Sequence, residues 1–313
     1  MQEFNGMTFK PYPENKGTIV CFTGADVPDH RDVLLSMEAK ACKLSYFGLT
    51  QRKFNIDDLI YDLSQFEYVV VEPGMGSVRN MMKKYPGSFN PGYFINKYYD
   101  FCHQIKDVVT VFLAYDFVTN DFTWEDIEDY VYKAQEQGLH IAPTVFPFMP
   151  PQRLIESGYL DHFDIVSMPF NEKHWNHSLV LADKVVKNGV KLHGHSISDM
   201  RKYQYLPLYS ADTSAWLDGQ KFGTTYRYTS GTLKSFNARD KERVRPMMYK
   251  KAEENGIDVS LLKMDNIVDR ADYKRMDSAV LSEVNAFNLM EWMEFAEFRR
   301  NFEGGRNVGA EID

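Results

Sequence analysis

The fold of this chain is constrained most by short apolar runs that alternate with segments of helical periodicity, from about residue 18 to residue 213. The runs are rich in Val, Ile, Phe and Tyr, and two of the segments between them end in glycine just before the next run. Near-continuous apolar strands that alternate with helices are typical of a parallel sheet covered on both faces. The seven runs are Thr18–Thr23, Tyr68–Glu72, Val108–Asp116, His140–Phe146, Phe163–Met168, Val190–His195 and Leu208–Asp212.

The clearest predicted helix reads TWEDIEDYVYKAQEQGL. Its first residue, Thr123, is a candidate N-cap, because Asp126 lies three residues later and can complete a capping box. Ile127 and Val131 recur on one face, and Gly138 ends the pattern. The segment is therefore expected to cover one face of the sheet.

Seven strands with short connections predict a (β/α)8, or TIM, barrel, with a doubly wound open sheet as the alternative. One strand is missing from the count, and we expect it either in the N-terminal region or in the hairpin-like segment TTYRYTSGTL. No glycine-rich nucleotide-binding motif follows a strand. After Leu233 the pattern becomes helical. We therefore expect a catalytic barrel over residues 1–232 and a helical extension over residues 233–313, packed on the barrel through apolar residues such as Phe287.

The length and composition exclude several classes of protein. At 313 residues the chain can bury a substantial core without disulfide or metal staples. Its cysteines, Cys21, Cys42 and Cys102, form no CxxC pair, which is typical of a reducing compartment. No run approaches the roughly 20 apolar residues of a membrane helix, and the N-terminus lacks a signal-peptide pattern. We expect a cytoplasmic protein without membrane contact, and the oligomeric state is left open.

Three of the apolar runs end in a carboxylate, at Glu72, Asp116 and Asp212. In a parallel barrel the carboxyl ends of the strands hold the reactive groups, because the βα loops converge there. Burial and like charges at that rim raise pKa values and separate an acid from a base. Each residue alone could instead cap the following helix or turn. The three together predict a carboxylate site, suited to acid–base work or to attack on a sugar carbon.

Aromatic residues lie beside the same strand ends. Flat rings that flank a polar cleft suit a heterocyclic base held by stacking. Packing in the core or at the barrel mouth is the alternative for each ring. The candidates are Tyr115, Phe146, Phe148 and Trp216.

A metal site is the competing chemistry. His193 and His195 lie on the same side of one predicted strand, and Asp212 on the next strand could supply a third ligand. The remaining histidines fall mostly in loops, helices or strand starts, so further partners are lacking and we expect no metal and no cofactor. The absence of a GxSxG motif argues against a serine hydrolase.

One segment inverts the charge of the chain. The net charge is −8, yet residues 234–251 carry seven Lys or Arg against two Asp or Glu. Such a patch suits contact with the phosphates of a nucleic acid. A solvated helix face with i,i+4 ion pairs is the alternative. The candidate phosphate-binding residues are Arg239, Lys241, Arg243 and Arg245.

The stretch LHGHSISDMRKYQYLPLYSADTSAWL, residues 192–217, resembles the DpdA proteins. These are phage and bacterial relatives of tRNA-guanine transglycosylase that exchange guanine in DNA for a 7-deazaguanine. The family shows a strand ending LHG, then a helix, then a strand reading YSADS-aW. The segments VFLAYDF and APTVFPFMPPQRL are similar to two further strands of the family. The resemblance spans about residues 65–220 and implies a TIM barrel, acting in the host cytoplasm if the gene is a phage gene.

Carried over to this sequence, the resemblance implies a role for each carboxylate. Asp212 attacks C1′ of deoxyribose and forms a covalent intermediate, Asp116 reads the guanine edge, and Glu72 is the general acid and base. Glu72 replaces an Asp of the family, Phe146 stands in place of a base-reading Gln, and Ser167 stands near a Gly-rich strand end that binds the base. The accepted base is therefore left open. The zinc site of the tRNA enzymes has no counterpart here, which favours DNA over tRNA.

The mechanism that the resemblance implies starts with a nucleotide extruded from DNA and stacked on Phe146 and Tyr115, near His193, His195 and Trp216. Guanine leaves and a free 7-deazaguanine, such as preQ0, enters with retention at C1′. DNA and the free base are the expected partners. Three alternatives stay open: a DNA glycosylase that only removes a base, a metal-dependent hydrolase, and a non-catalytic nucleic-acid-binding barrel.

Overall fold

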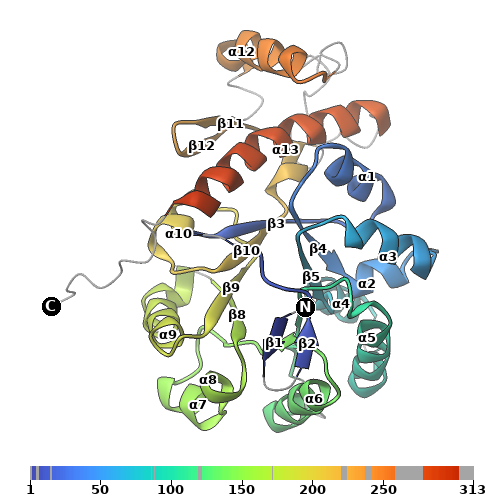
Figure 1. The fold of residues 1–313 in the computed structure, drawn as a ribbon, viewed down its shortest axis with the longest axis vertical. Coiled ribbons are helices and arrows are strands. Elements are labelled where there is room, and N and C mark those ends of the chain that lie inside the picture. Colours follow the sequence, from blue (N-terminus) through green and yellow to red (C-terminus); the bar gives the residue numbers. More distant parts are fainter. Residues whose placement is uncertain are drawn as a thin grey trace, which may run out of the picture.

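Eight parallel strands form a barrel in the computed structural model, which describes residues 2–4, 7–14, 16–85, 87, 89–118, 122–170, 172–219, 224–236, 241–257 and 278–302. The strands are hydrogen-bonded in the order β7-β6-β5-β4-β3-β10-β9-β8 (Figure 1). Their bounds are β3 (Ile19–Thr23), β4 (Ala41–Ser45), β5 (Tyr68–Glu72), β6 (Val111–Leu113), β7 (Ile141–Ala142), β8 (Ile165–Pro169), β9 (Lys191–His195) and β10 (Ser210–Thr213).

The first and last strands of that order meet and close the barrel. Thr144, just after β7, forms a parallel bridge with Ser167 of β8. The Val145 N–H donates to the Ser167 carbonyl, and the Ser167 N–H donates to the Pro143 carbonyl. The predicted TIM barrel is confirmed, and the doubly wound open sheet is wrong.

The missing eighth strand is β4, in the N-terminal region. Its sequence, ACKLS, has a lysine at its centre that interrupts the apolar pattern. The alternative location was wrong, because TTYRYTSGTL forms the separate antiparallel hairpin of β11 (Thr225–Thr229) and β12 (Thr232–Phe236). The boundary predicted after residue 232 falls at the first residue of β12.

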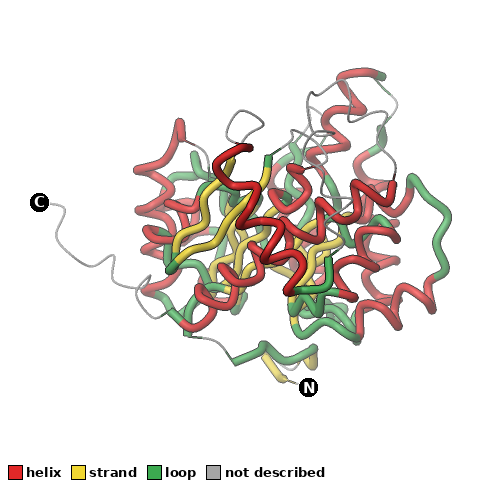
Figure 2. Tube along the Cα trace, turned by 90° about the horizontal axis from the view of Figure 1, so that it is seen from above, coloured by secondary structure: helices red, strands yellow, loops and turns green. Residues whose placement is uncertain are grey.

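Helices surround the strands on the outside of the barrel (Figure 2). The helix predicted after Thr123 is present with its capping box, in which the Thr123 N–H donates to Asp126 and the Asp126 N–H donates to Thr123 Oγ1. The helices between the strands are α1 (Pro28–Ser36), α2 (Tyr46–Thr50), α3 (Ile56–Ser64), α4 (Met75–Lys84), α5 (Pro91–Ile105), α6 (Trp124–Glu136), α7 (Pro151–Glu156), α8 (Tyr159–His162), α9 (Trp175–Lys187) and α10 (Met200–Tyr205).

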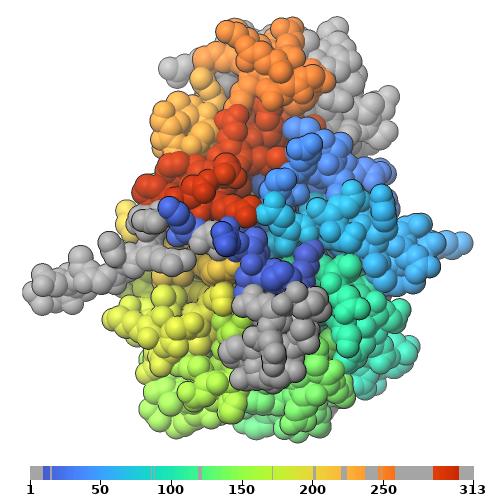
Figure 3. Space-filling model, viewed as in Figure 1, coloured from blue at the N-terminus to red at the C-terminus, as the bar shows by residue number. Residues whose placement is uncertain are grey.

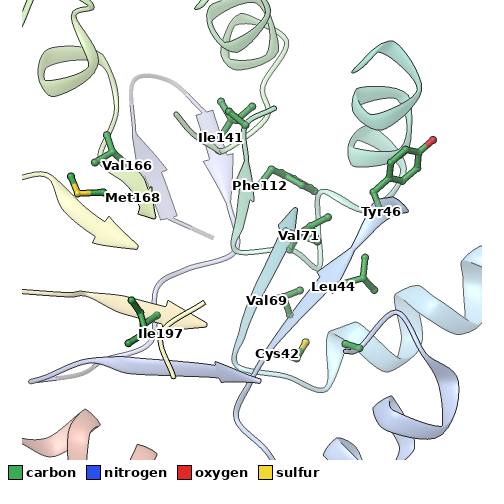
Figure 4. Close-up of a cluster of buried hydrophobic side chains, with 14 of the residues drawn as sticks. Cys42, Leu44, Tyr46, Val69, Val71, Phe112, Ile141, Val166, Met168 and Ile197 are labelled. Carbon is green, nitrogen blue, oxygen red and sulfur yellow. The ribbon is translucent and has the colours of Figure 1, made fainter. Parts of the chain in front are cut away.

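Strand side chains alternate between two apolar cores. Outward-facing residues such as Val69, Val71 and Phe112 pack against the helices (Figure 4). Inward-facing residues such as Cys21 and Val70 fill the barrel itself. The interior is therefore a packed core that reaches up to the polar groups at the carboxyl ends of the strands.

The amino-terminal face of the barrel is covered by residues before β3. Lys10 Nζ donates to the carbonyls of Phe66 and Val108, which precede β5 and β6. The Tyr12 ring stacks on Tyr68, and the Lys191 ammonium lies 4.3 Å from its centre. In Figure 3 the dark-blue atoms of the described residues just before β3 lie on the barrel face turned to the viewer. The carboxyl ends of the strands form the opposite face.

The C-terminal part adds α12 (Lys241–Glu254) and the long α13 (Ser278–Asn301). In Figure 1 α13 crosses the barrel next to β3 and α1, and α12 lies beyond it. The Thr18 N–H donates to the Arg299 carbonyl, and Trp292 and Phe295 are buried. The extension thus packs on the barrel as expected. Among the described residues, no helix combines the length and apolar character that a membrane crossing requires.

A hydroxyl holds the start of β5 against β6, and its removal should be costly. Thr110 is fully buried, and its Oγ1 accepts a hydrogen bond of 3.0 Å from the Val69 N–H. Thr110→Val keeps the shape but leaves that N–H without an acceptor, so we expect a loss of about 1–3 kcal/mol in the free energy of unfolding, measured in urea. Thr229→Val, on the exposed end of β11, is the control and should change stability by less than about 0.5 kcal/mol. Equal effects of the two substitutions would contradict this account.

Candidate functional site

A buried lysine lies between two of the predicted carboxylates. Lys43 is the central residue of β4, and its side chain points into the barrel with 5% of its surface exposed. Its Nζ is 2.9 Å from Glu72 Oε2 and 2.9 Å from Asp212 Oδ2. Glu72 ends the neighbouring strand β5, whereas Asp212 is on β10, two strands away on the other side. A single ammonium group therefore joins three strands at the carboxyl end of the barrel.

This lysine keeps Asp212 ionised in a fully buried position. Burial alone would raise the pKa of Asp212, but the charge of Lys43 and the hydrogen bond from His193 outweigh it and hold the pKa well below 3.8. In the same way, burial would lower the pKa of Lys43, and Asp212 and Glu72 raise it above its usual value. The pair is charged over the whole physiological range of pH.

A chain of hydrogen bonds fixes the other oxygen of Asp212. His193 Nε2 is 3.2 Å from Asp212 Oδ1, and His193 Nδ1 is 2.9 Å from Ser210 Oγ. Ser210 Oγ is in turn 3.0 Å from the Tyr68 hydroxyl. All of these groups are satisfied when Tyr68 donates to Ser210, Ser210 donates to Nδ1, and the Nε2–H donates to the carboxylate. The orientation of Asp212 is thus set from inside the barrel.

His195 lies next to this chain and is neutral. Its ring centre is 5.5 Å from that of His193, and burial lowers the pKa of His195 to about 3. Among the described residues, its buried Nε2 has no hydrogen-bond partner. Ser196, which follows, has a φ of 52°, a left-handed conformation that is uncommon outside glycine. The Ile197 N–H then donates to the Asp212 carbonyl, so the strained turn joins β9 to β10.

The predicted alternative metal ligands do come together. One ligand atom each of His193, His195 and Asp212 lies within 4.8 Å of the others. The Nδ1 of His193 is held by Ser210, which is the kind of outer contact that orients a metal-binding histidine. However, Lys43 already supplies a positive charge at Asp212. Residues for three ligands are present, but a cation there would lie close to an ammonium group.

Asp116, the third predicted carboxylate, belongs to the same rim. It follows β6, and its Oδ1 is 3.7 Å from Arg79 Nη2 on α4. Burial raises the pKa of Asp116 to about 6; Arg79 opposes this shift, and the charge of Glu72 adds to it. Asp116 interacts electrostatically with both Glu72 and Lys43, so the three carboxylates gather at one end of the barrel.

The predicted aromatic residues divide into two groups. Tyr115 is buried in the outer core against Phe94 and Phe122, and Trp216 is fully buried with its Nε1–H donating to the Thr23 carbonyl. Neither ring is open to a ligand, so the stacking role predicted for both is corrected to core packing. The sequence could not indicate whether the Tyr115 side chain faces the barrel interior or the helices. The reason is that β6 ends at Leu113, where the alternation of side chains between the two faces stops.

Phe146 instead lines a cavity of about 240 Å³ beside the end of β7, together with Phe148 and Trp124. Ser167 is buried nearby in β8, and its Oγ is 3.1 Å from Thr144 Oγ1. Thr144 also lines the cavity. Ser167 is in register with His193 on β9, so this cavity and the carboxylate site lie at the same end of the barrel.

The predicted phosphate contacts are only partly placed. Arg239 lies outside the described residues, and Lys241, Arg243 and Arg245 are in α12, where the structure describes only the backbone of these residues. At the end of that helix, Lys251 Nζ is 3.0 Å from Glu291 and 2.8 Å from Glu294 of α13. Part of the basic segment thus anchors α12 to α13, and the phosphate contacts stay a prediction.

The chain matches no family model and no curated protein. Solved structures of tryptophan synthase from the hyperthermophile Pyrococcus furiosus are similar to it at 13% identity. The α2β2 complex aligns with a TM-score of 0.43 over 66% of this chain and 92% of that chain. A single-residue variant of the α-subunit aligns with a TM-score of 0.44 over 68% of this chain and 93% of that chain.

Loss of the buried ammonium should destabilise the protein in a pH-dependent way. Lys43→Met leaves Asp212 buried without its cation, so we expect a loss of about 3–5 kcal/mol at pH 7. Without Lys43, burial raises the pKa of Asp212, and protonation then relieves part of the loss as the pH falls toward 4. Urea unfolding at several pH values measures this. Lys40→Met, at an exposed ion pair, is the control. A loss of less than about 1 kcal/mol at pH 7 would contradict the stabilising role assigned to Lys43.

Replacement of Asp116 should raise the stability of the protein at neutral pH, in contrast to replacement of Lys43. Its pKa in the folded protein is about 6 instead of 3.8, so the stability contributed by its protonated form is present below pH 4 and is lost as the pH rises through 6. Asp116→Asn should therefore raise stability at pH 7.5 by about 1–3 kcal/mol and have little effect at pH 4. Thermal unfolding across this range tests it, with the exposed Asp100→Asn as the control. Parallel pH profiles of wild type and Asp116→Asn would contradict the assignment.

Proposed function

We propose that this protein is a base-exchange transglycosylase that replaces guanine in DNA with a free 7-deazaguanine. The observation that carries the proposal is the shared ammonium group: Asp212 Oδ2 and Glu72 Oε2 are each 2.9 Å from Lys43 Nζ. The two oxygens cannot lie further apart than these two distances combined. That limit is close to the roughly 5–5.5 Å between the carboxylates of retaining glycosidases, in which one carboxylate attacks the sugar.

Asp212 is the nucleophile in this proposal. A carboxylate attacks an anomeric carbon only in its ionised form, and Lys43 and His193 keep Asp212 ionised despite its burial. The space between Asp212 and Glu72 already stabilises one positive charge, that of Lys43. An oxocarbenium-like transition state also carries positive charge, so the same two carboxylates favour it once the lysine side chain moves aside.

The reaction then proceeds in two displacements. Once the Lys43 side chain moves aside, Glu72 takes up a proton from solvent. Asp212 Oδ2 then forms a bond to C1′ while the C1′–N9 bond of guanine breaks, and Glu72 gives that proton to the departing base and becomes a carboxylate again. The incoming 7-deazaguanine loses its N9 proton to Glu72, its N9 attacks C1′, and the bond between C1′ and Asp212 breaks. Two inversions at C1′ give net retention, and no oxidant, reductant or metal is consumed.

In this proposal, Asp116 and His195 recognise the base. Because the pKa of Asp116 is about 6, its carboxyl group takes up a proton more readily than an ordinary aspartate. In that form it can donate a hydrogen bond to O6 or N7 of guanine, which are acceptors. His195 stays neutral, and its Nε2 has no partner in the part of the chain that the structure describes, so it can pair with a further polar atom of the base. The likeness of residues 192–217 to the DpdA proteins supports DNA as the substrate, and the basic segment supports contact with its phosphates.

Incubation with duplex DNA and isotope-labelled preQ0 or guanine tests this function, with mass spectrometry of the nucleosides as the readout. The wild type should incorporate the label, and Asp212→Asn should lower incorporation by at least about 1,000-fold, because the nucleophile is lost. Asp183→Asn, at an exposed ion pair on α9, is the matched control and should keep full activity. Equal incorporation by wild type and Asp212→Asn would refute the role of Asp212, and abasic sites without incorporation would identify a glycosylase.

A metal-dependent hydrolase is the second candidate, because the ligand atoms of His193, His195 and Asp212 converge within 4.8 Å. Such a site could activate a water molecule. It is the weaker candidate, since Lys43 Nζ competes with a cation for the Asp212 carboxylate. Elemental analysis of the purified protein decides: about one zinc or manganese per chain, lost in His195→Ala, would favour the hydrolase, and less than a tenth of that would favour the transglycosylase.

A further inference from the structure

We infer that the cavity beside the end of β7 is a second binding site, selective for the keto-amino edge of guanine or a 7-deazaguanine. The cavity has a volume of about 240 Å³ and lies between α6, α7 and the loop that joins β7 to α7. That volume is below the roughly 300–1,000 Å³ of sites for drug-sized ligands, so it suits a single planar ring system. This inference goes beyond the proposed chemistry at Asp212 and does not require it.

Aromatic rings supply the walls. The rings of Trp124 and Phe146 have centres 4.3 Å apart, and those of Phe146 and Phe148 are 5.4 Å apart with an angle of 33° between their planes. Phe148 is 56% exposed, so its ring is accessible to a ligand in the cavity. Rings in this arrangement offer a stacking surface to the face of a heterocyclic base.

A charged pair supplies the polar side of the cavity. Arg153 Nη2 is 2.7 Å from both Oε1 and Oε2 of Glu128, and both residues line the cavity. Within the described part of the chain, no hydrogen bond to the remaining N–H groups of Arg153 is present. An arginine donor beside a carboxylate acceptor matches guanine, which offers O6 as an acceptor and the 2-amino group as a donor on the same edge. Adenine presents an amino group where guanine has O6, and would place it against Arg153.

The cavity is held open by its own loop. The Met149 N–H donates to the Phe146 carbonyl and closes a turn, and His177 Nε2 of α9 is 2.8 Å from the Met149 carbonyl. Pro150 and Pro151 then start α7, and their fixed φ angles limit the freedom of the loop. A ligand would therefore meet a preformed site and would have to order little of the chain on binding.

Binding of guanosine, inosine and adenosine, followed by Trp124 fluorescence and by saturation-transfer NMR, tests the inference. We expect guanosine to bind at least 10-fold more tightly than adenosine, with inosine between them because it lacks the 2-amino group. Phe148→Ala should weaken guanosine binding about 5- to 100-fold through the loss of one stacking ring. Tyr93→Ala, which removes an exposed ring on α5, is the matched control and should have no effect.

Glu128→Gln keeps the shape of the cavity but adds a donor to its polar side, so it should reduce the preference for guanosine over adenosine. Asp212→Asn should bind guanosine as the wild type does, which separates this site from the carboxylate site. Equal affinities for the three nucleosides, or an unchanged affinity in Phe148→Ala, would overturn the inference. Normal guanosine binding by Asp212→Asn, together with a loss of base exchange, would support a binding site separate from the carboxylate site.

Discussion

The structure depends on one buried positive charge, the ammonium group of Lys43, placed between Glu72 and Asp212 inside the barrel. Removal of three charged groups from water is unfavourable, and only close pairing and further hydrogen bonds make it tolerable. The chain from Tyr68 through Ser210 and His193 supplies those bonds to Asp212. Four inward-facing side chains therefore fix the charge and the orientation of the Asp212 carboxylate. They are Lys43, Tyr68, His193 and Ser210.

The two ends of the barrel have different tasks. At the amino-terminal end, Lys10 donates to backbone carbonyls just before β5 and β6, and the Tyr12 ring stacks on Tyr68. At the carboxyl end the strands finish in ionisable side chains, and the loops there form a cavity beside them. The shift in the pKa of Asp116 and the strained Ser196 are both at this end. Backbone strain and shifted pKa values persist only where the surrounding structure enforces them, and both are common at functional sites.

Much of this could be predicted from the sequence, and the exceptions have physical reasons. Seven strands were recognisable because both of their faces are apolar, and the three strand-end carboxylates were found through their position after those runs. The strand β4 was missed because Lys43 interrupts its apolar run, although Ala41, Lys43 and Ser45 share the inward face at a spacing of two. A buried lysine is recognisable only with its partners, and these come from β5 and β10, far away in the chain. The cavity beside β7 depends on α6 and α7 as well, so strand patterns alone could not indicate it.

The central claim is that Asp212 attacks C1′ in the proposed base exchange, and a search for a residue with covalently attached deoxyribose tests it most directly. The wild-type protein is mixed with duplex DNA, quenched in acid during turnover and digested, and the peptides are examined by mass spectrometry for a covalently attached deoxyribose. If Lys43 holds an ionised Asp212 ready for attack, the adduct is on Asp212 and is absent from the Asp212→Asn protein. An adduct on any other residue, or release of the base with no adduct at all, would contradict the account.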